Sequence, residues 1–157
     1  MQPVHVQASR IVAIGIEDAY DRTLAMPLPE LFAQRHVMLP PIAEVWDAPE
    51  VWGEPGQTRR IRTTDGGTLH ETLTACERPT HFTYRIDEIR GPMKPLVRTI
   101  DGAWRFVPSG TGTEVSWEWT LHPTSRVTRP TVQLVGRFWN GYAAKALAVL
   151  DAHLARS

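Results

Sequence analysis

The sequence predicts an α+β fold in which one long C-terminal helix lies across a curved antiparallel sheet. Two observations predict it. Between about residues 57 and 123, short segments of alternating apolar and polar residues follow one another, separated by turns rich in Gly and Pro. After Pro123, apolar residues recur every three or four positions, which is the period of a helix. An apolar sheet face and an apolar helix stripe are buried most economically on each other.

The segment before residue 57 predicts one strand and two short helices. Residues 18–26 ("DAYDRTLAM") alternate in polarity and predict the first strand. Residues 27–35 predict a short helix, because their proline and glutamate suit a first helical turn. Residues 40–46 ("PPIAEVW") predict a second short helical turn. Residues 1–17 are compatible with either an N-terminal extension or the start of the first strand.

The central segment predicts a run of antiparallel hairpins. The Asp65-Gly66-Gly67 group supplies the positive-φ positions that a tight turn requires. The predicted strands of this run cover residues 57–64, 68–77, 81–90, 96–107 and 113–122. A helix over about residues 128–155 then ends the chain, since it is rich in alanine and keeps the helical period. Its apolar stripe consists of Val135, Phe138, Trp139, Tyr142, Ala146, Val149 and Leu150.

The tryptophans fix which face of the sheet is the inner one. Side chains alternate along a strand, so Trp117 and Trp119 share the apolar face, whereas Glu118 between them faces water. Pairing the last two strands sets Trp104 opposite Trp117 and Gly102 opposite Trp119. A glycine opposite a tryptophan leaves room for the indole. The same parity places further residues inside, namely Ile61, Thr63, Leu69, Leu73, Ala75, Phe82, Tyr84, Ile86 and Phe106.

These inward side chains either fill the interior or line a cavity between the sheet and the helix. Aromatic residues dominate them, and each large aromatic buries roughly 150–250 Å². The predicted cavity residues are Ile61, Leu69, Glu71, Leu73, Phe82, Tyr84, Ile86, Trp104, Phe106, Trp117, Trp119, Phe138, Trp139 and Tyr142. A cavity so poor in polar groups suits an apolar ligand.

Several segments in this order carry a resemblance to a known family. They are "MPLPELFA", "LPPIAEVW", "GEPGQTRRIRTTDGGTLHETL", "RPTHFTYRI", "GTGTEVSWEWTLHP" and the closing alanine-rich helix. From about residue 18 to residue 154, the chain resembles the START/Bet v 1-like superfamily, particularly its polyketide cyclase/dehydrase branch (SRPBCC proteins). The resemblance implies a helix-grip fold, with a curved antiparallel sheet of about seven strands wrapped around a long C-terminal helix and two short helices after the first strand. It also implies a hydrophobic cavity for lipids, polyketides or similar molecules, and it assigns no catalytic residue.

Glu71 is the most informative polar residue. By parity it faces the interior, opposite Ile61 and next to Ile86. A buried carboxylate is costly unless it is paired, and burial raises its pKa. Glu71 is therefore a candidate general acid/base or ligand-orienting group, and the alternative is a structural carboxylate satisfied by Arg59 or Tyr84. Tyr84 is a second catalytic candidate, as a hydroxyl donor to the ligand, although most inward tyrosines simply pack.

Glu88 and Arg98 form a second candidate pair, placed by parity at the mouth of the cavity, and an ordinary cross-strand ion pair is the alternative. No metal site or cofactor is expected, because the histidines lack HxxH or HxxxH spacing and Cys76 has no partner. The segment "GTGTEV" lacks the third glycine of a dinucleotide loop. No serine lies in a GxSxG setting.

Composition bounds the partners and the setting. The 157 residues predict a single domain over 1–157, and 42% apolar with 22% charged residues is typical of a soluble globular protein. Zero formal net charge argues against a nucleic-acid partner. The single cysteine fits a reducing compartment, and no signal peptide or membrane-spanning run is evident. We therefore expect a cytoplasmic protein without integral membrane association; its oligomeric state is left open.

Three functions remain at this point. The leading hypothesis is binding of a hydrophobic small molecule, such as a lipid or polyketide, in the internal cavity. The second is a polyketide cyclase/dehydratase-type enzyme that uses Glu71 for proton transfer, assisted by Tyr84. The third is an interaction module with a filled core. An open cavity would separate the first two hypotheses from the third.

Overall fold

The computed structural model describes residues 2–156. Its seven strands form one antiparallel sheet in the order β1-β7-β6-β5-β4-β3-β2, and the fold is the helix-grip arrangement that the sequence predicts. The strands are β1 (Val4–Val12), β2 (Ile42–Trp46), β3 (Thr58–Thr63), β4 (Thr68–Glu77), β5 (His81–Arg90), β6 (Val97–Ser109) and β7 (Gly112–Pro123). The helices are α1 (Ile16–Ala25), α2 (Leu28–Leu31) and α3 (Arg129–Leu154).

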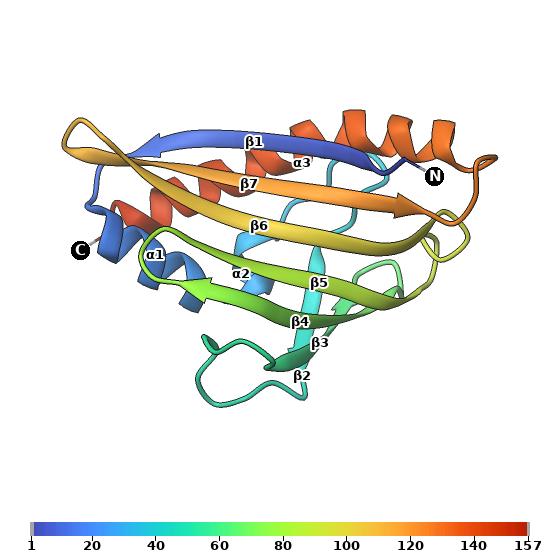
Figure 1. The fold of residues 1–157 in the computed structure, drawn as a ribbon, viewed down its shortest axis with the longest axis horizontal. Helices are drawn as coiled ribbons and strands as arrows, with labels where there is room; N and C mark the ends of the chain where they lie inside the picture. The colour runs from blue at the N-terminus through green and yellow to red at the C-terminus, as the bar shows by residue number, and fades with distance from the viewer. Residues whose placement is uncertain (1, 157) are drawn as a thin grey trace.

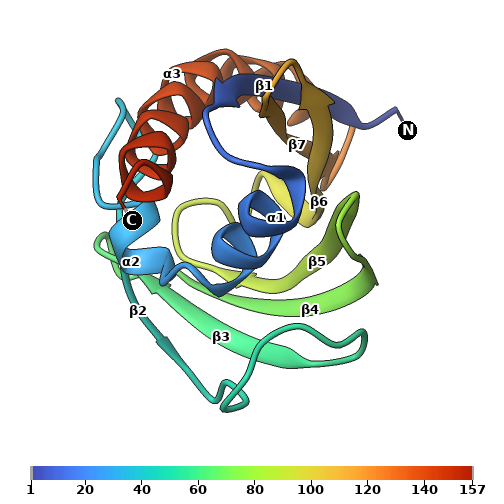
Figure 2. The ribbon, with the colours of Figure 1, turned by 90° about the vertical axis from the view of Figure 1, so that its left-hand side faces the viewer.

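The sheet curves around the interior, and α3 runs along its inner side (Figure 1). Seen from one end, the strands and α3 surround the interior, and α1 lies across that end (Figure 2). Tyr20 of α1 fills this end, since its ring lies 5.6 Å from that of Phe82 and 5.5 Å from that of Phe106. The interior is therefore closed by an aromatic plug on the side of α1.

The predicted register of the last hairpin is confirmed. Trp104 pairs with Trp117 and Gly102 pairs with Trp119 across β6 and β7. The Trp104 and Trp117 side chains are almost completely buried, at 4% and 1% exposure. Glu118 lies on the outer face, where it accepts a 3.1 Å hydrogen bond from Arg105.

The long helix α3 begins and ends within one residue of its predicted bounds. Pro130 lies in its first turn, where the missing backbone N–H costs no hydrogen bond. Gly136 lets the helix approach β1 closely, because a Cβ atom at this position would lie 3.1 Å from Val6 and 3.4 Å from Val4. No helix within residues 2–156 combines the length and apolar character needed to cross a membrane.

Two predictions for the N-terminal segment are wrong, and the structure decides the alternative that the sequence left open for residues 1–17. Of the predicted strand over residues 18–26, residues 18–25 belong to α1, and the buried side chains of α1 (Ala19, Tyr20 and Thr23) have helical spacing. Residues 40–46 contain strand β2 instead of a helical turn, because their backbone pairs with β3. The first strand lies within residues 1–17, where β1 pairs with β7 along its whole length.

Two β-bulges change the predicted facing of side chains. One extra residue in β4, at Thr74, turns Ala75 away from the core and brings Cys76 against it. A second bulge in β5, near Glu88 (φ 47°), brings Ile89 into the core. The predictions that Ala75 and Glu88 face inward are therefore wrong.

Candidate functional site

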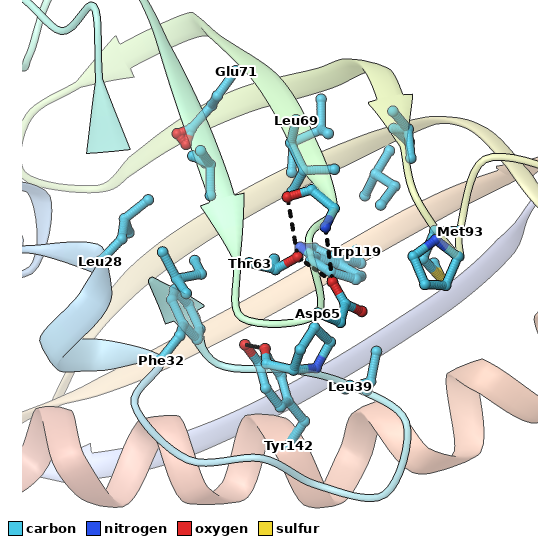
Figure 3. Close-up of a pocket in the computed structure, with 18 of the residues that line it drawn as sticks. Leu28, Phe32, Leu39, Thr63, Asp65, Leu69, Glu71, Met93, Trp119 and Tyr142 are labelled. Carbon is cyan, nitrogen blue, oxygen red and sulfur yellow. Dashed lines mark hydrogen bonds between the residues drawn. The ribbon is translucent and has the colours of Figure 1, made fainter. Parts of the chain in front are cut away.

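A cavity of about 180 Å³ lies between the sheet and α3 (Figure 3). Its wall is mostly apolar and comes from the sheet, α3, α2 and three loops. The lining residues are Leu28, Phe32, Met38, Leu39, Pro40, Ile42, Arg59, Ile61, Thr63, Asp65, Gly67, Leu69, Glu71, Tyr84, Ile86, Ile89, Arg90, Pro92, Met93, Leu96, Ile100, Trp104, Trp117, Trp119 and Tyr142. The interior is not completely filled by side chains.

Three loops at the end of the molecule opposite α1 form the mouth of the cavity, because their lining residues Met38, Asp65 and Pro92 are exposed (Figure 1). These loops, residues 36–40, 64–67 and 91–96, each contribute lining residues. The second loop is joined to Pro41, which directly follows the first loop, by a 3.0 Å hydrogen bond from the backbone N–H of Thr64 to the Pro41 carbonyl. Met38 lines the cavity and is 44% exposed, so the first loop reaches from the cavity to solvent.

Most of the predicted cavity residues line the wall, and five do not. Those on the wall are Ile61, Leu69, Glu71, Tyr84, Ile86, Trp104, Trp117, Trp119 and Tyr142. Those away from it are Leu73, Phe82, Phe106, Phe138 and Trp139. The cause is clearest for Phe82 and Phe106, because the segment predicted as a strand is α1, whose Tyr20 covers both rings. Trp139 is fully buried and packs against Trp117, with 4.7 Å between ring centroids.

A hydrogen-bonded trio of aromatic residues forms one part of the wall. The hydroxyl oxygen of Tyr84 accepts hydrogen bonds from Trp117 Nε1 at 2.8 Å and from Trp119 Nε1 at 2.9 Å. The Tyr84 ring reaches these indoles by crossing β6 directly over Gly102, where a Cβ atom would overlap the ring. Burial, together with the nearby Glu71 carboxylate, raises the pKa of Tyr84, so the hydroxyl keeps its proton at neutral pH.

Glu71 lies on the cavity wall and is 4% exposed. It pairs across the strands with Arg59 rather than with Ile61, because the β3–β4 turn is centred on Asp65 instead of Gly66. Arg59 donates from Nε to Glu71 Oε2 at 3.0 Å and from Nη2 to Oε1 at 3.2 Å. Burial raises the pKa of Glu71, and the Arg59 guanidinium only partly offsets this effect.

Trp52, in the loop between β2 and β3, covers the Arg59 guanidinium, whose central carbon lies 4.0 Å from the indole centroid. Of the two partners that the sequence proposes for Glu71, the structure therefore brings Arg59 into hydrogen-bonding contact, whereas Tyr84 bonds the two indoles. The carboxylate and its partner form a polar end to a mostly apolar wall.

The predicted mouth pair of Glu88 and Arg98 does not form. The bulge in β5 turns Glu88 to the outer face, where it lies 3.5 Å from Arg60 and 3.4 Å from His70 Nδ1. Arg98 is exposed. His70 Nδ1 also lies 2.7 Å from Asp87, so the bulge gathers three groups of metal-ligand type that sequence spacing does not reveal. His70, Asp87 and Glu88 contact one another and Arg60, so these contacts explain the cluster as a polar network on the surface.

Sequence reasoning missed the part of the wall that the loops and α2 supply. Phe32 contacts Trp117 with 4.9 Å between ring centroids and stacks on Tyr142 at 5.7 Å. Leu39 is buried behind a tight turn, closed by backbone hydrogen bonds in both directions with His36. In the sequence, Phe32 is an apolar residue shortly after a proline-rich helix start, and this position could have indicated that it faces the core. No local pattern indicates that Leu39 does.

Comparison with solved structures supports the same architecture. Ginseng major latex-like protein 151 from Panax ginseng is 13% identical, with 99% of both chains covered and a TM-score of 0.73. A protein from Thermus thermophilus is 20% identical, with 98% of this chain and 100% of that chain covered and a TM-score of 0.66. The di-domain ARO/CYC BexL from the BE-7585A biosynthetic pathway is 18% identical, with a TM-score of 0.70 over 99% of this chain and 51% of that chain. At these identities the likeness concerns the fold alone.

Comparison of the sequence itself identifies the family. No match was found among curated proteins. A model of the family described as polyketide cyclase / dehydrase and lipid transport matches residues 3–155, which is nearly the whole chain. The structural neighbours have the same helix-grip fold. The chain therefore belongs to the polyketide cyclase / dehydrase and lipid transport family, among the SRPBCC and Bet v 1-like proteins.

Proposed function

We propose that the protein binds an apolar small molecule in the cavity between the sheet and α3. The observation that carries the proposal is the hollow of about 180 Å³, walled by aromatic and aliphatic side chains and open toward solvent at three loops. Pockets of this composition are the usual sites for small hydrophobic ligands. Family membership points the same way. A filled interaction module, the third hypothesis, is disfavoured because the interior retains space.

The volume limits the size of the ligand. An apolar cavity of roughly 150 Å³ in another protein stays dry and binds benzene. A cavity of about 180 Å³ therefore suits a molecule with one aromatic ring and a short substituent. Long-chain lipids and multi-ring polyketides would require the loops at the mouth to move apart. We accordingly propose a compact, ring-sized ligand in place of an extended lipid.

The binding of ethylbenzene to the ¹⁵N-labelled protein tests this proposal. The sequence contains six tryptophans, three of which line the cavity. We expect saturable shifts of the indole N–H signals of Trp104, Trp117 and Trp119. The signal of Trp46 on β2, which does not line the cavity, should stay in place as an internal control. Absence of any saturable shift up to the solubility limit of ethylbenzene would argue against the cavity as a binding site.

A cyclase- or dehydratase-type activity is the second candidate function. It is favoured by one observation, the buried Glu71 on the cavity wall. Burial raises the pKa of this carboxyl group, which makes it a stronger proton acceptor than an exposed carboxylate. The pairing with Arg59 is equally compatible with a structural role. Glu71→Gln separates the two roles: an enzyme would lose turnover while keeping its affinity for an apolar ligand. Unchanged turnover of a polyketide-type substrate in this variant would exclude Glu71 as the acid/base.

A further inference from the structure

The Tyr84 hydroxyl donates its proton in neither of the two hydrogen bonds that the structure gives it. An indole N–H can only donate, so the hydroxyl oxygen acts as acceptor toward both Trp117 and Trp119. The hydroxyl proton must then be donated to a different atom. Within residues 2–156, the hydrogen bonds of this hydroxyl are these two, and neither of them uses its proton. A buried hydroxyl donor without an acceptor is unfavourable, and Tyr84 lines the cavity.

The other hydroxyl groups on the wall are already engaged. Tyr142 donates to the carbonyl of Pro40 at 2.9 Å. Thr63 lies 2.6 Å from the carboxylate of Asp65, to which its hydroxyl donates. Arg59 uses Nε and Nη2 for Glu71, which leaves Nη1 as a competing donor at the polar end. Tyr84 is thus the hydroxyl whose proton remains available, and it lies beside the indoles of the apolar part of the wall.

We infer that the cavity selects a ring-sized ligand that carries a hydrogen-bond acceptor, such as an aryl ketone or aldehyde, and that Tyr84 donates to this acceptor. The inference rests on the proposed binding function and deepens it by naming the ligand class. The two indoles hold the hydroxyl oxygen in place, so its proton is oriented before a ligand enters. A preorganised donor discriminates better than a mobile one, because less freedom is lost on binding.

The experiment compares acetophenone with ethylbenzene, two probes of similar shape that differ by a carbonyl group. Their dissociation constants are measured by NMR titration for the unmodified protein, for Tyr84→Phe and for Tyr142→Phe. The last variant is a matched control, because it removes a wall hydroxyl that is already bonded to Pro40. We expect Tyr84→Phe to reduce the preference for acetophenone over ethylbenzene by roughly 2- to 10-fold, the range for one neutral hydrogen bond. Tyr142→Phe should leave this preference unchanged.

A second measurement requires no variant and covers the case in which Tyr84→Phe folds poorly. The infrared carbonyl band of acetophenone bound to the unmodified protein should lie below its frequency in cyclohexane, because a hydrogen bond weakens the carbonyl bond. A bound carbonyl with the cyclohexane frequency would overturn the inference. An equal preference for acetophenone in the unmodified protein and in Tyr84→Phe would also overturn it and would favour Arg59 as the donor. In both cases ethylbenzene binding would still support the proposed function, whereas failure of both probes to bind would overturn that function as well.

Discussion

Replacing Gly102 by alanine should destabilise the protein, although the same change in an unobstructed strand would stabilise it. Glycine in a strand interior is usually less favourable than alanine by roughly 0.5–1 kcal/mol. At Gly102, however, the added methyl group would overlap the ring of Tyr84, which lies directly over this position. The ring has no simple escape, because its hydroxyl is bonded to Trp117 and Trp119 at 2.8 and 2.9 Å. The sign of the effect therefore tests the packing.

The expected magnitude follows from the contacts that the displaced ring loses. Overpacking of a core costs about 1–3 kcal/mol. Each buried indole N–H left without an acceptor costs about 1–3 kcal/mol more, although a small shift of the ring keeps part of both bonds. We expect Gly102→Ala to lower the free energy of unfolding by about 3 kcal/mol. Urea denaturation followed by tryptophan fluorescence and circular dichroism measures this quantity.

The control is the same substitution in a chain that lacks the Tyr84 ring. In the Tyr84→Ala background, Gly102→Ala should be neutral or slightly stabilising, because the methyl group then has room. The coupling between the two positions should account for most of the loss. Equal losses in both backgrounds, or a gain in stability from Gly102→Ala alone, would refute the proposed contact between Tyr84 and β6.

Three further predictions concern stability. Glu71→Gln should lower the free energy of unfolding by about 1–3 kcal/mol at pH 7, because the amide keeps only one of the two oxygens that accept hydrogen bonds from Arg59. Since burial raises the folded pKa of Glu71, the native chain should gain further stability relative to the variant as pH falls toward the ordinary value of 4.5. Burial disfavours the Asp101 carboxylate, but Arg85 and His122 outweigh burial, so the pKa of Asp101 is lowered. Asp101→Asn should therefore cost under about 1 kcal/mol of stability at pH 7. This difference between the native chain and the variant should vanish as pH falls through the folded pKa of Asp101. Gly136→Val should cost about 2 kcal/mol by forcing α3 away from β1. Urea denaturation at several pH values between 3 and 8 measures all three effects. The opposite pH trend for Glu71→Gln or Asp101→Asn would contradict the direction of the pKa shift given for that residue, and an unchanged stability of Gly136→Val would contradict the close contact between α3 and β1.

The sheet was predictable from the sequence because its strands repeat a consistent alternation. Trp104, Trp117 and Gly102 fix one register, and any slip by one residue would turn the tryptophans to solvent. The long helix was predictable because its apolar stripe persists over many turns. Both are properties of a long segment, to which many residues contribute the same information.

The predictions failed where only a few residues decide the structure. In α1, Tyr20 fits a strand face and a helix face equally well, and packing against Phe82 and Phe106 decides for the helix. The bulges near Thr74 and Glu88 each depend on one inserted residue, and local polarity does not reveal them. The cavity wall was predicted for the sheet and α3, whereas the contributions of the loops depend on tertiary contacts.

A crystal structure of the protein soaked in iodobenzene tests the central claim most directly, because the anomalous signal of iodine locates the ring without relying on the surrounding density. We predict one strong peak between the sheet and α3, bounded by Trp119, Tyr142 and Phe32. A peak only at the outer surface, or an interior in which side chains fill the hollow and exclude iodobenzene at saturation, would contradict the account.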